Sequence, residues 1–399
     1  MSTDGTQRHI LVINSGSSSL KFAVINPSEG QEILRGLAER LGNADATLTL
    51  EREGRKTSIP MEENDHAAAL RALPDILKDH PIDAVGHRVV HGGEHFSAPA
   101  LIKEPVLEAI QACVNLAPLH NPANLQGIHA AREAFPDLPQ VAVFDTAFHQ
   151  TLPPHAYHYA IPYRFYEEHR IRRYGFHGTS HVYVGMEAAK QLDRTFEDVC
   201  LITAHLGNGC SACAIRNGES VDTTMGLTPL EGLVMGTRSG DVDPNLHGFL
   251  HARAGLSIEA IETLLNKESG LLGLSGISGD MRSLGNAAEA GNERAQLAID
   301  LFCYRLAKAI LGLTVALPRL DALVFTGGIG EHAAGIRSQT LSHLGLLGLS
   351  LDEKSNDSHG ADRQGRVESV DSRAAILVVP TNEELMIARA SAHCLSPTL

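Results

Sequence analysis

Apolar residues follow two spacing patterns along the chain, one typical of strands and one typical of helices. Short apolar runs rich in β-branched residues lie at 9–30 and again at 200–223, and a glycine-rich turn interrupts each of them. Each run predicts a β-hairpin, because its turn is too short for anything but folding back. The first tip carries residues 14–19 and the second carries residues 207–209.

Helical spacing of apolar residues appears at 65–80 and 293–318, between segments that have a different pattern. Those segments, at 83–93, 140–149 and 321–331, are short apolar runs that end in polar or glycine turns, and they predict buried strands. Strands that alternate with helices predict an α/β fold.

The same strand–turn–strand element opens both halves of the chain, which indicates duplication. We therefore predict two similar domains around a cleft where ligands bind, residues 1–150 with 384–399 and residues 151–383. The helical pattern at 381–394 is expected to return to the first domain. Pro153-Pro154 is the predicted hinge.

Composition narrows the partners and the compartment. A chain of 399 residues that is 43% hydrophobic can form two ordinary domains. The net charge of −14 argues against nucleic acid or an anionic membrane as a partner. Because no apolar run is long enough to span a bilayer and the first residues lack a signal-peptide core, we expect a cytoplasmic location. The six cysteines are widely spread, which predicts reduced thiols.

Glycine-rich turns follow apolar strands at three places, 15–19, 205–211 and 326–331. Backbone N–H groups in such turns can cradle phosphate oxygens, since no Cβ obstructs them. The chain contains neither a GxxxxGK[ST] P-loop nor a strand–GxGxxG–helix fingerprint. A phosphate cradle of another kind is therefore predicted.

Two arginines, Arg88 and Arg238, lie beside glycines at the ends of strand-like runs. A guanidinium binds carboxylate or phosphate through paired donors and stays charged at any working pH. The alternative for each is a salt bridge to a neighbouring carboxylate.

Acidic residues suggest a divalent ion. Asp145 follows a buried strand, where α/β proteins place ligand-binding carboxylates, and could hold Mg²⁺ directly or through water; turn capping is the alternative. Glu383 and Glu384 are either helix-start acids or a second carboxylate for the metal, and the sequence favours the helix start.

Histidines number 21, and some could carry chemistry. His120 and His177, beside proline and glycine turns, are candidate donors to a transferring phosphoryl group. A zinc site at His91 and His95 is disfavoured, because Gly92-Gly93 opposes the helix that an HExxH-type site needs. The CSAC segment at 210–213 predicts small core side chains within a strand.

Nine segments together resemble the acetate kinase family, in the same order and over essentially the whole chain. They are INSGSSSLKF, GHRVVHGGE, APLHNP, FDTAFH, YGFHGTSH, AHLGNGCS, MGTRSGDVDP, FTGGIGE and TNEELMIAR. The resemblance implies duplicated ribonuclease H-like domains of the actin-like ATPase fold. It also implies a reversible transfer of the γ-phosphoryl group of ATP to acetate, giving acetyl phosphate and ADP. Mg²⁺ is the implied ion, with Mn²⁺ as a substitute, and a homodimer the implied assembly.

The resemblance also implies roles for particular residues. Arg88 and Arg238 would bind acetate and the transferring phosphoryl group, and His177 would donate a hydrogen bond to that group, with His120 nearby. Asp145 would orient the carboxylate or Mg²⁺. Asn14 and Glu383 are the implied metal-site residues, and the implied methyl pocket consists of Val90, Leu119 and Pro229. The implied nucleotide-binding residues are Ser17, Ser19, Lys21, His205, Gly207, Asn208, Gly209, Asp280, Met281, Arg282, Gly327, Gly328, Ile329 and Gly330.

Other functions remain open from the sequence. A propionate or butyrate kinase is the nearest, because one methylene changes binding by only about 1–3 kcal/mol. A non-catalytic nucleotide-binding protein could dispense with Arg88, Arg238 and His177, all of which are present, and a zinc hydrolase is the third alternative. His332 stands where members of the family often have asparagine, which bears on adenosine contact.

Overall fold

The computed structural model describes residues 8–61, 63–118 and 120–396. These residues form two compact units, and the chain crosses from one to the other at Gln150/Thr151 and at Thr381/Asn382. Each unit is built around its own β-sheet.

The sheet of the first unit has the strand order β5-β4-β3-β2-β1-β6-β8-β7. Its strands are β1 Ile10–Ser15, β2 Ser19–Asn26, β3 Gln31–Glu39, β4 Thr47–Arg52, β5 Arg55–Pro60, β6 Ala84–Val89, β7 Ala100–Leu101 and β8 Gln140–Phe144. Strands β1 and β2 form the predicted antiparallel hairpin, in which Asn14 lies opposite Lys21. Because β1, β6 and β8 are parallel, their carboxyl ends meet at one edge of the sheet.

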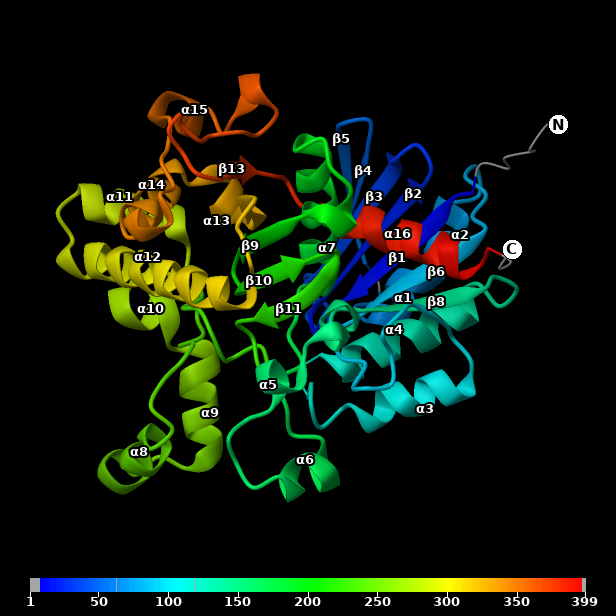
Figure 1. Ribbon diagram of the computed structural model, residues 1–399. Coiled ribbons are helices and arrows are strands. Elements are labelled where there is room, and N and C mark those ends of the chain that lie inside the picture. Colours follow the sequence, from blue (N-terminus) through cyan, green and yellow to red (C-terminus); the bar gives the residue numbers. More distant parts are fainter. Residues whose placement is uncertain (1–7, 62, 119, 397–399) are drawn as a thin grey trace. The chain divides into compact units, whose positions relative to one another are not determined.

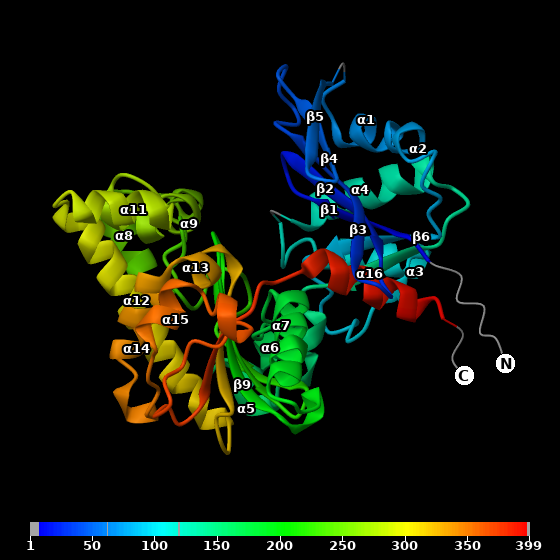
Figure 2. The ribbon, with the colours of Figure 1, turned by 90° about the horizontal axis from the view of Figure 1, so that it is seen from above.

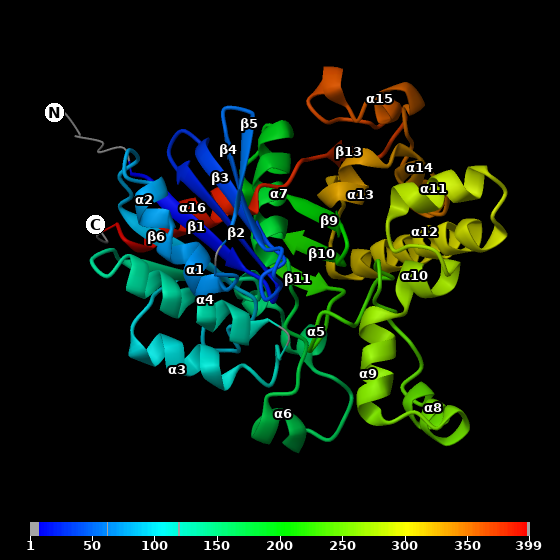
Figure 3. The same ribbon diagram turned by 180° about the vertical axis from the view of Figure 1, so that it is seen from behind.

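Helices cover both faces of this sheet. They are α1 His66–Arg71, α2 Leu73–Ile76, α3 Glu104–Ala112, α4 Asn121–Ala134 and α16 Glu383–Cys394. Helix α16 lies in front of the sheet in Figure 1, and α1 and α2 lie in front of it in Figure 3. The last helix, which the sequence analysis expects to return to the first domain, packs on β1 and β6. The predicted helical stretch at 65–80 is divided into two short helices, and Pro74 occupies the first turn of the second.

Two close approaches explain why the helices fit so tightly on this sheet. A Cβ atom at Gly127 of α4 would lie 2.0 Å from Ser15 Oγ at the end of β1, and one at Gly86 of β6 would lie 2.5 Å from Ser391 Oγ of α16. Both glycines are therefore places where backbone meets a neighbouring element.

The sheet of the second unit repeats this pattern with the order β11-β10-β9-β12-β13. Its strands are β9 Cys200–Leu206, β10 Cys210–Arg216, β11 Glu219–Thr223, β12 Ala322–Thr326 and β13 Ala375–Val378. Strands β9, β10 and β11 are antiparallel, whereas β9, β12 and β13 are parallel, as are β1, β6 and β8 in the first unit. The predicted fold class, a duplicated α/β fold of the actin-like ATPase type, is confirmed.

Helices also lie on both faces of the second sheet, with α7 on one side and α12 on the other (Figure 2). The helices of this unit are α5 Pro154–Tyr157, α6 Arg164–His169, α7 Gly178–Gln191, α8 Leu246–Ala254, α9 Ile258–Lys267, α10 Gly270–Ser275, α11 Met281–Glu289, α12 Glu293–Leu313, α13 Gly327–His332, α14 Ala334–Ser342 and α15 Glu353–Asp357. Helix α12 begins after Asn292, whose side chain accepts a hydrogen bond from the Ala295 N–H, and its apolar stripe is buried.

One predicted turn is a helix. The glycines at 327–330 form the first turn of α13 and not a loop, because strand β12 leads into the helix directly. Gly327 makes this possible: its φ is +75°, and a Cβ atom there would lie 2.8 Å from the Leu206 carbonyl oxygen.

The predicted thiol state agrees with the structure, in which all six cysteines are free. Cys210 and Cys213 are buried in β10, as the sequence predicts. Throughout the described ranges, no helix combines the length and apolar character needed to cross a bilayer.

Candidate active site

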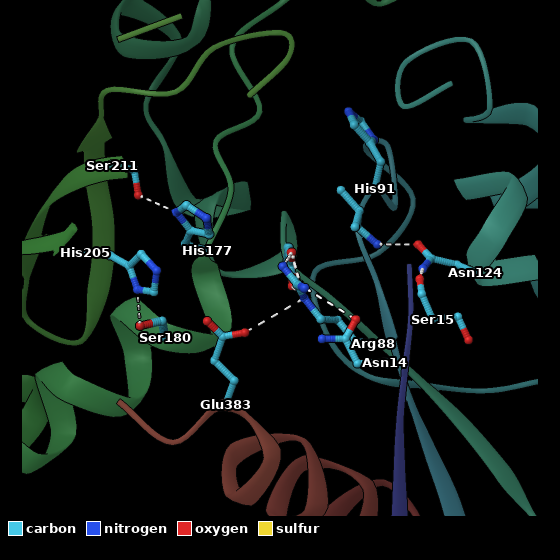
Figure 4. A network of polar contacts seen from close by, with 12 residues as sticks. Asn14, Ser15, Arg88, His91, Asn124, His177, Ser180, His205, Ser211 and Glu383 are labelled. Carbon is cyan, nitrogen blue, oxygen red and sulfur yellow. Dashed lines mark hydrogen bonds and ion pairs between the residues drawn. The ribbon is translucent and has the colours of Figure 1, made fainter. Parts of the chain in front are cut away.

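Arg88, at the end of β6, lies at the centre of the polar residues of the first unit. Its Nη2 and Nε donate to the carboxylate of Asp145, which follows β8, at 2.7 Å and 3.0 Å. Its Nη1 lies 3.4 Å from Asn14 Oδ1 at the end of β1, and Nε lies 3.8 Å from Glu383 Oε2 at the start of α16 (Figure 4). The parallel strand ends therefore bring Asn14, Arg88 and Asp145 together, and the start of α16 adds Glu383.

Burial and charge oppose each other in the Arg88–Asp145 pair. Burial raises the pKa of Asp145 even though the Arg88 guanidinium opposes that rise. Burial also works to lower the pKa of Arg88, but the carboxylates of Asp145 and Glu383 outweigh it and raise that pKa. Because the Asp145 side chain is only 2% exposed, its negative charge depends on Arg88.

Glu383 takes the helix-start position that the sequence favoured. It occupies the first turn of α16, after Asn382, whose side chain accepts from the Leu385 N–H. Its carboxylate lies farther from Arg88 than that of Asp145 does and is 20% exposed. Glu383 and Asn14 each lie beside Arg88, and a partly exposed carboxylate and an amide oxygen are ligand types that suit a magnesium ion, which takes few protein ligands and completes its shell with water and phosphate.

The start of α4 holds this region through two asparagines that the sequence analysis did not single out. Asn124 accepts from the Val90 N–H at 3.0 Å and donates to the Ser15 carbonyl at 2.9 Å. Asn121 accepts from the His91 N–H and donates to the His91 carbonyl. Both side chains are buried, so the predicted pocket residue Val90 is fixed by backbone and side-chain contacts together.

The phosphate-side hairpin of the first unit is also braced. At its tip the Gly16 N–H donates to the Ser19 carbonyl at 2.8 Å, and His66 on α1 contacts the Gly16 carbonyl through Nε2 at 2.7 Å. Ser17 and Lys21 are exposed beside the tip and Ser19 is half-buried. Exposed hydroxyls and an ammonium group on a short, braced tip can bind an anion.

Of the remaining predicted residues in this unit, His120 immediately precedes α4 and is close enough to Asp145 to influence its charge. Leu119 lies outside the described residues. The segment 90–95 is not helical, as predicted, and His91 is buried. Within the part of the chain that the structure describes, no three His, Cys, Asp or Glu side chains are grouped in a way that could hold a metal ion by themselves.

In the second unit, Gly209, His177 and Arg238 meet at one point. A Cβ atom at Gly209 would lie 3.4 Å from His177 Cε1 and 3.5 Å from Arg238 Nη1. The salt bridge that was the alternative for Arg238 is not present: among the described residues no carboxylate lies within ion-pair distance, and Nη1 has only the Pro229 carbonyl at 3.5 Å and Met235 Sδ at 3.9 Å. Burial lowers the pKa of this guanidinium.

His177 is held in an orientation in which its Nε2 atom faces Gly209, at 3.5 Å from a Cβ built there. Its backbone is left-handed, with φ +58°, and its Nδ1 lies 2.9 Å from Ser211 Oγ (Figure 4). Its ring stacks on His205, with centroids 4.3 Å apart, and His205 Nδ1 in turn contacts Ser180 Oγ at 2.8 Å. Ser211 and Ser180 therefore orient two histidines; both serines lie within the quoted segments AHLGNGCS and YGFHGTSH, but neither was given a role there.

A pocket of about 410 Å³ lies in the same unit. Most of its wall consists of predicted nucleotide-binding residues, which come from the β9–β10 tip, the start of α11 and helix α13. The lining residues are Gly207, Asn208, Gly279, Asp280, Met281, Arg282, Gly328, Ile329, His332 and Ala333. Glycines with one methionine and one isoleucine provide a narrow apolar slot, and Asn208, Asp280 and Arg282 provide polar groups, which is the composition of a small-ligand site.

Four predicted nucleotide-site residues of this unit do not line this pocket, namely His205, Gly209, Gly327 and Gly330. His205 stacks on His177, and Gly327 and Gly330 are buried within α13. Asp280 caps α11 by accepting from the Ser283 N–H at 2.9 Å, and this hydrogen bond lowers the pKa of its carboxyl.

Fold and site together define a class of protein. Two units of this topology, each with a glycine-containing hairpin turn after its first strand, are typical of a kinase of the actin-like ATPase fold. Arginines take the place of a P-loop in this class of site. Comparison with known proteins makes the assignment particular, since residues 9–389 match the acetokinase family.

Individual relatives agree with this match. An acetate kinase of Deinococcus radiodurans is 58% identical over 386 residues, which is 96% of this chain and 97% of that one. Among solved structures, a propionate kinase of Francisella tularensis has a TM-score of 0.92 at 47% identity and covers 96% of this chain and 98% of its own. The acetate kinase of Porphyromonas gingivalis has a TM-score of 0.92 at 42% identity, with coverage of 98% and 100%. The chain belongs to the acetokinase family, and it is a phosphotransferase with a carboxyl group as acceptor.

Proposed function

We propose that this enzyme transfers the γ-phosphoryl group of ATP reversibly to acetate, giving acetyl phosphate and ADP. The environment of Arg238 is the observation that supports the proposal most. A half-buried guanidinium without a carboxylate partner, beside a histidine and a glycine, is a site made for an anion that the chain itself does not supply.

The chemistry needs little more than alignment and charge neutralisation. Acetate is already an anion, so no strong base is required to activate it. Arg238 and the Nε2 atom of His177 would donate to the equatorial oxygens of the phosphoryl group in transfer. Arg88, held in one orientation by Asp145, would bind the carboxylate of the acceptor, with Val90 and Pro229 as apolar neighbours of its methyl group.

The nucleotide would occupy the pocket between α11 and α13. Asn208 and Gly209 would present backbone N–H groups to its phosphates. The Gly207 N–H donates to the Gly209 carbonyl at 3.1 Å and so holds the shape of the tip, and Met281 and Ile329 would contact adenosine. Mg²⁺, held by Glu383 with Asn14 and water, would neutralise phosphate charge when bound. With ATP as the donor, the reaction belongs in the cytoplasm.

A hydroxamate assay for acyl phosphate tests the proposal. Purified enzyme is incubated with Mg-ATP and acetate, propionate or butyrate, and kcat/KM is compared across the series. Acetate should give the highest value. A higher value for propionate would make the enzyme a propionate kinase, as the Francisella relative is named, and no acyl phosphate with any acid would refute the kinase function altogether.

We also propose a homodimer. Three large apolar side chains on α12, Leu297, Tyr304 and Leu311, are 53%, 56% and 37% exposed. Their seven-residue spacing places them along one stripe of the helix, and exposed apolar stripes of this kind mark protein interfaces. Light scattering during gel filtration should give twice the mass of the chain, and Tyr304→Glu should give a monomer; a wild-type monomer would refute the proposal.

A further inference from the structure

The segment that carries Pro229 and Arg238 has no regular secondary structure of its own. Residues 224–245, between β11 and α8, form only turns and bends. Their path is therefore set by contacts with other segments of the second unit. Since Arg238 Nη1 lies 3.5 Å from the Pro229 carbonyl, whatever fixes one of these two residues also bears on the other.

Arg173 fixes the beginning of this segment. Its Nη1 lies within 3.0 Å of three successive carbonyl oxygens, those of residues 223, 224 and 225, and its Nη2 donates to Glu231 Oε1 at 2.5 Å. Its own N–H donates to the Tyr157 carbonyl at 2.8 Å. Arg173 is also only four residues before His177. The chain that leads into His177 is therefore hydrogen-bonded to the start of the segment that carries Pro229.

Tyr159 fixes the same carboxylate from another side. Its hydroxyl donates to Glu231 Oε2 and accepts from the Leu227 N–H at 2.8 Å. Burial and the adjacent Glu231 carboxylate both raise the pKa of Tyr159, so the hydroxyl keeps the proton that it donates. Glu231 is thus held by a guanidinium and a phenol, two residues beyond Pro229.

Gly226 shows how closely the segment folds around this carboxylate. A Cβ atom at Gly226 would lie 1.6 Å from Glu231 Oε2 and 2.3 Å from Tyr159 Oη, so only glycine fits there. The Gly226 carbonyl accepts from the N–H of Tyr174 at 3.0 Å, which ties the segment again to the stretch before His177.

We infer that Tyr159, Arg173 and Glu231, named here the Glu231 clamp, are positioning residues that set where Pro229 and Arg238 stand, and through them the affinity and selectivity for the acceptor carboxylate. The inference rests on the proposed function. The clamp touches neither nucleotide-pocket residues nor reacting groups; it acts by the path of the 224–238 segment. The residues that line the nucleotide pocket come from other segments, and the 224–238 segment meets them at Gly236, whose N–H donates to the Asn208 carbonyl at 3.1 Å. Because Pro229 lies closer to the clamp than Gly236 does, the clamp should affect the acceptor more strongly than ATP.

Tyr159→Phe is the mildest test, because it removes one hydroxyl and keeps the ring. Glu231→Gln keeps the shape and removes the charge. For both variants we expect kcat/KM for acetate to fall by about tenfold or more, since displacement of catalytic groups by about 1 Å is costly. KM for ATP should stay within about twofold, the acetate-to-propionate preference should change, and the thermal midpoint should move by only a few degrees. In the double variant the losses should be less than additive, as expected for residues that act as one unit.

Lys190→Gln, which removes an exposed ion pair with Glu187 on α7, is the matched control and should behave as wild type. Equal effects on acetate and ATP, unchanged kinetics in both clamp variants, or activity lost only in step with thermal stability would each overturn the inference while leaving the proposed function intact. A wild-type enzyme that phosphorylates no short carboxylate would overturn both.

Discussion

Arg238→Met should lower kcat strongly without lowering the free energy of unfolding. The guanidinium has no carboxylate partner, and its nearest acceptors are a carbonyl oxygen at 3.5 Å and a thioether sulfur at 3.9 Å. Burial lowers its pKa, which means that folding disfavours its charge. Methionine preserves most of the side-chain volume and removes that unfavourable charge. We therefore expect the free energy of unfolding to stay the same or to rise slightly.

Activity should respond in the opposite direction. Loss of one donor that stabilises transition-state charge costs about 10²–10³ in kcat, or roughly 3–4 kcal/mol. The wild-type residue would thus reduce the stability of the free enzyme and contribute several kcal/mol to the reaction, as expected for a residue that awaits an anionic ligand.

Arg88→Met is the matched comparison. It leaves the Asp145 carboxylate, 2% exposed, without the guanidinium that donates to it at 2.7 Å and 3.0 Å. Breaking a buried pair in this manner costs about 3–5 kcal/mol. Arg88→Met should therefore lose stability as well as activity, and adding Asp145→Asn should recover part of the stability and none of the activity.

Urea denaturation followed by circular dichroism, together with the hydroxamate assay on the same preparations, measures both quantities. The reasoning is refuted if Arg238→Met is destabilised as strongly as Arg88→Met, or if Arg238→Met keeps activity within threefold of wild type.

Three further outcomes follow from the structure. His87 is buried and its pKa is lowered to about 4, so below its ordinary pKa of about 6.5 the unfolded chain binds a proton that the folded chain does not. The free energy of unfolding should keep its full value above pH 6.5 or so and fall by up to about 3 kcal/mol as the pH drops toward 4. His87→Gln should flatten this pH dependence, whereas the exposed control His129→Gln should not. Equal pH curves for the two variants would contradict the assignment to His87. Gly327→Ala should raise KM for ATP and lower the thermal midpoint, because a Cβ at φ +75° would lie 2.8 Å from the Leu206 carbonyl; Gly328→Ala, which has open space on the pocket side, should leave the thermal midpoint nearly unchanged. Chelation with EDTA should abolish acyl phosphate formation and added Mg²⁺ should restore it, and activity that survives chelation would exclude the proposed role of the ion.

The parts of the fold and site that depend on local pattern could be predicted from the sequence. The hairpins at the start of each half follow from β-branched runs broken by glycine. The meeting of Arg88 with Asp145 follows from two buried strands that end in polar residues, because parallel strands present their carboxyl ends at one edge.

Contacts between distant segments could not be predicted in this way. Arg173 precedes Glu231 by 58 residues and Tyr159 precedes it by 72 residues. No periodicity in the sequence relates the three positions. The buried asparagines at the start of α4 look like ordinary helix-start residues in the sequence. Whether an arginine is paired is likewise a property of the folded chain: Arg88 and Arg238 have similar sequence surroundings, and only one of them has a carboxylate partner among the described residues.

The duplicated topology gives each unit the same arrangement of strand ends, so the side chains at those ends decide what each unit can bind. In the first unit the ends of β6 and β8 lead into Arg88 and Asp145, whose charges suit a small polar acceptor and an ion. In the second unit the end of β12 leads into Gly327, and the Glu331 carboxylate accepts from the N–H groups of both Gly327 and Thr381, at 2.9 Å and 3.1 Å. That carboxylate joins the end of β12 to the chain beyond β13. Helix α13 borders the pocket at Gly328, which has no side chain to fill it. We therefore expect the glycines of the second unit to allow the close backbone approach that a flat base and phosphates need, and Arg88 and Asp145 of the first unit to serve the acceptor carboxylate and the ion. Arg238 of the second unit would add a charge for the phosphoryl group, although both units are built on one strand order.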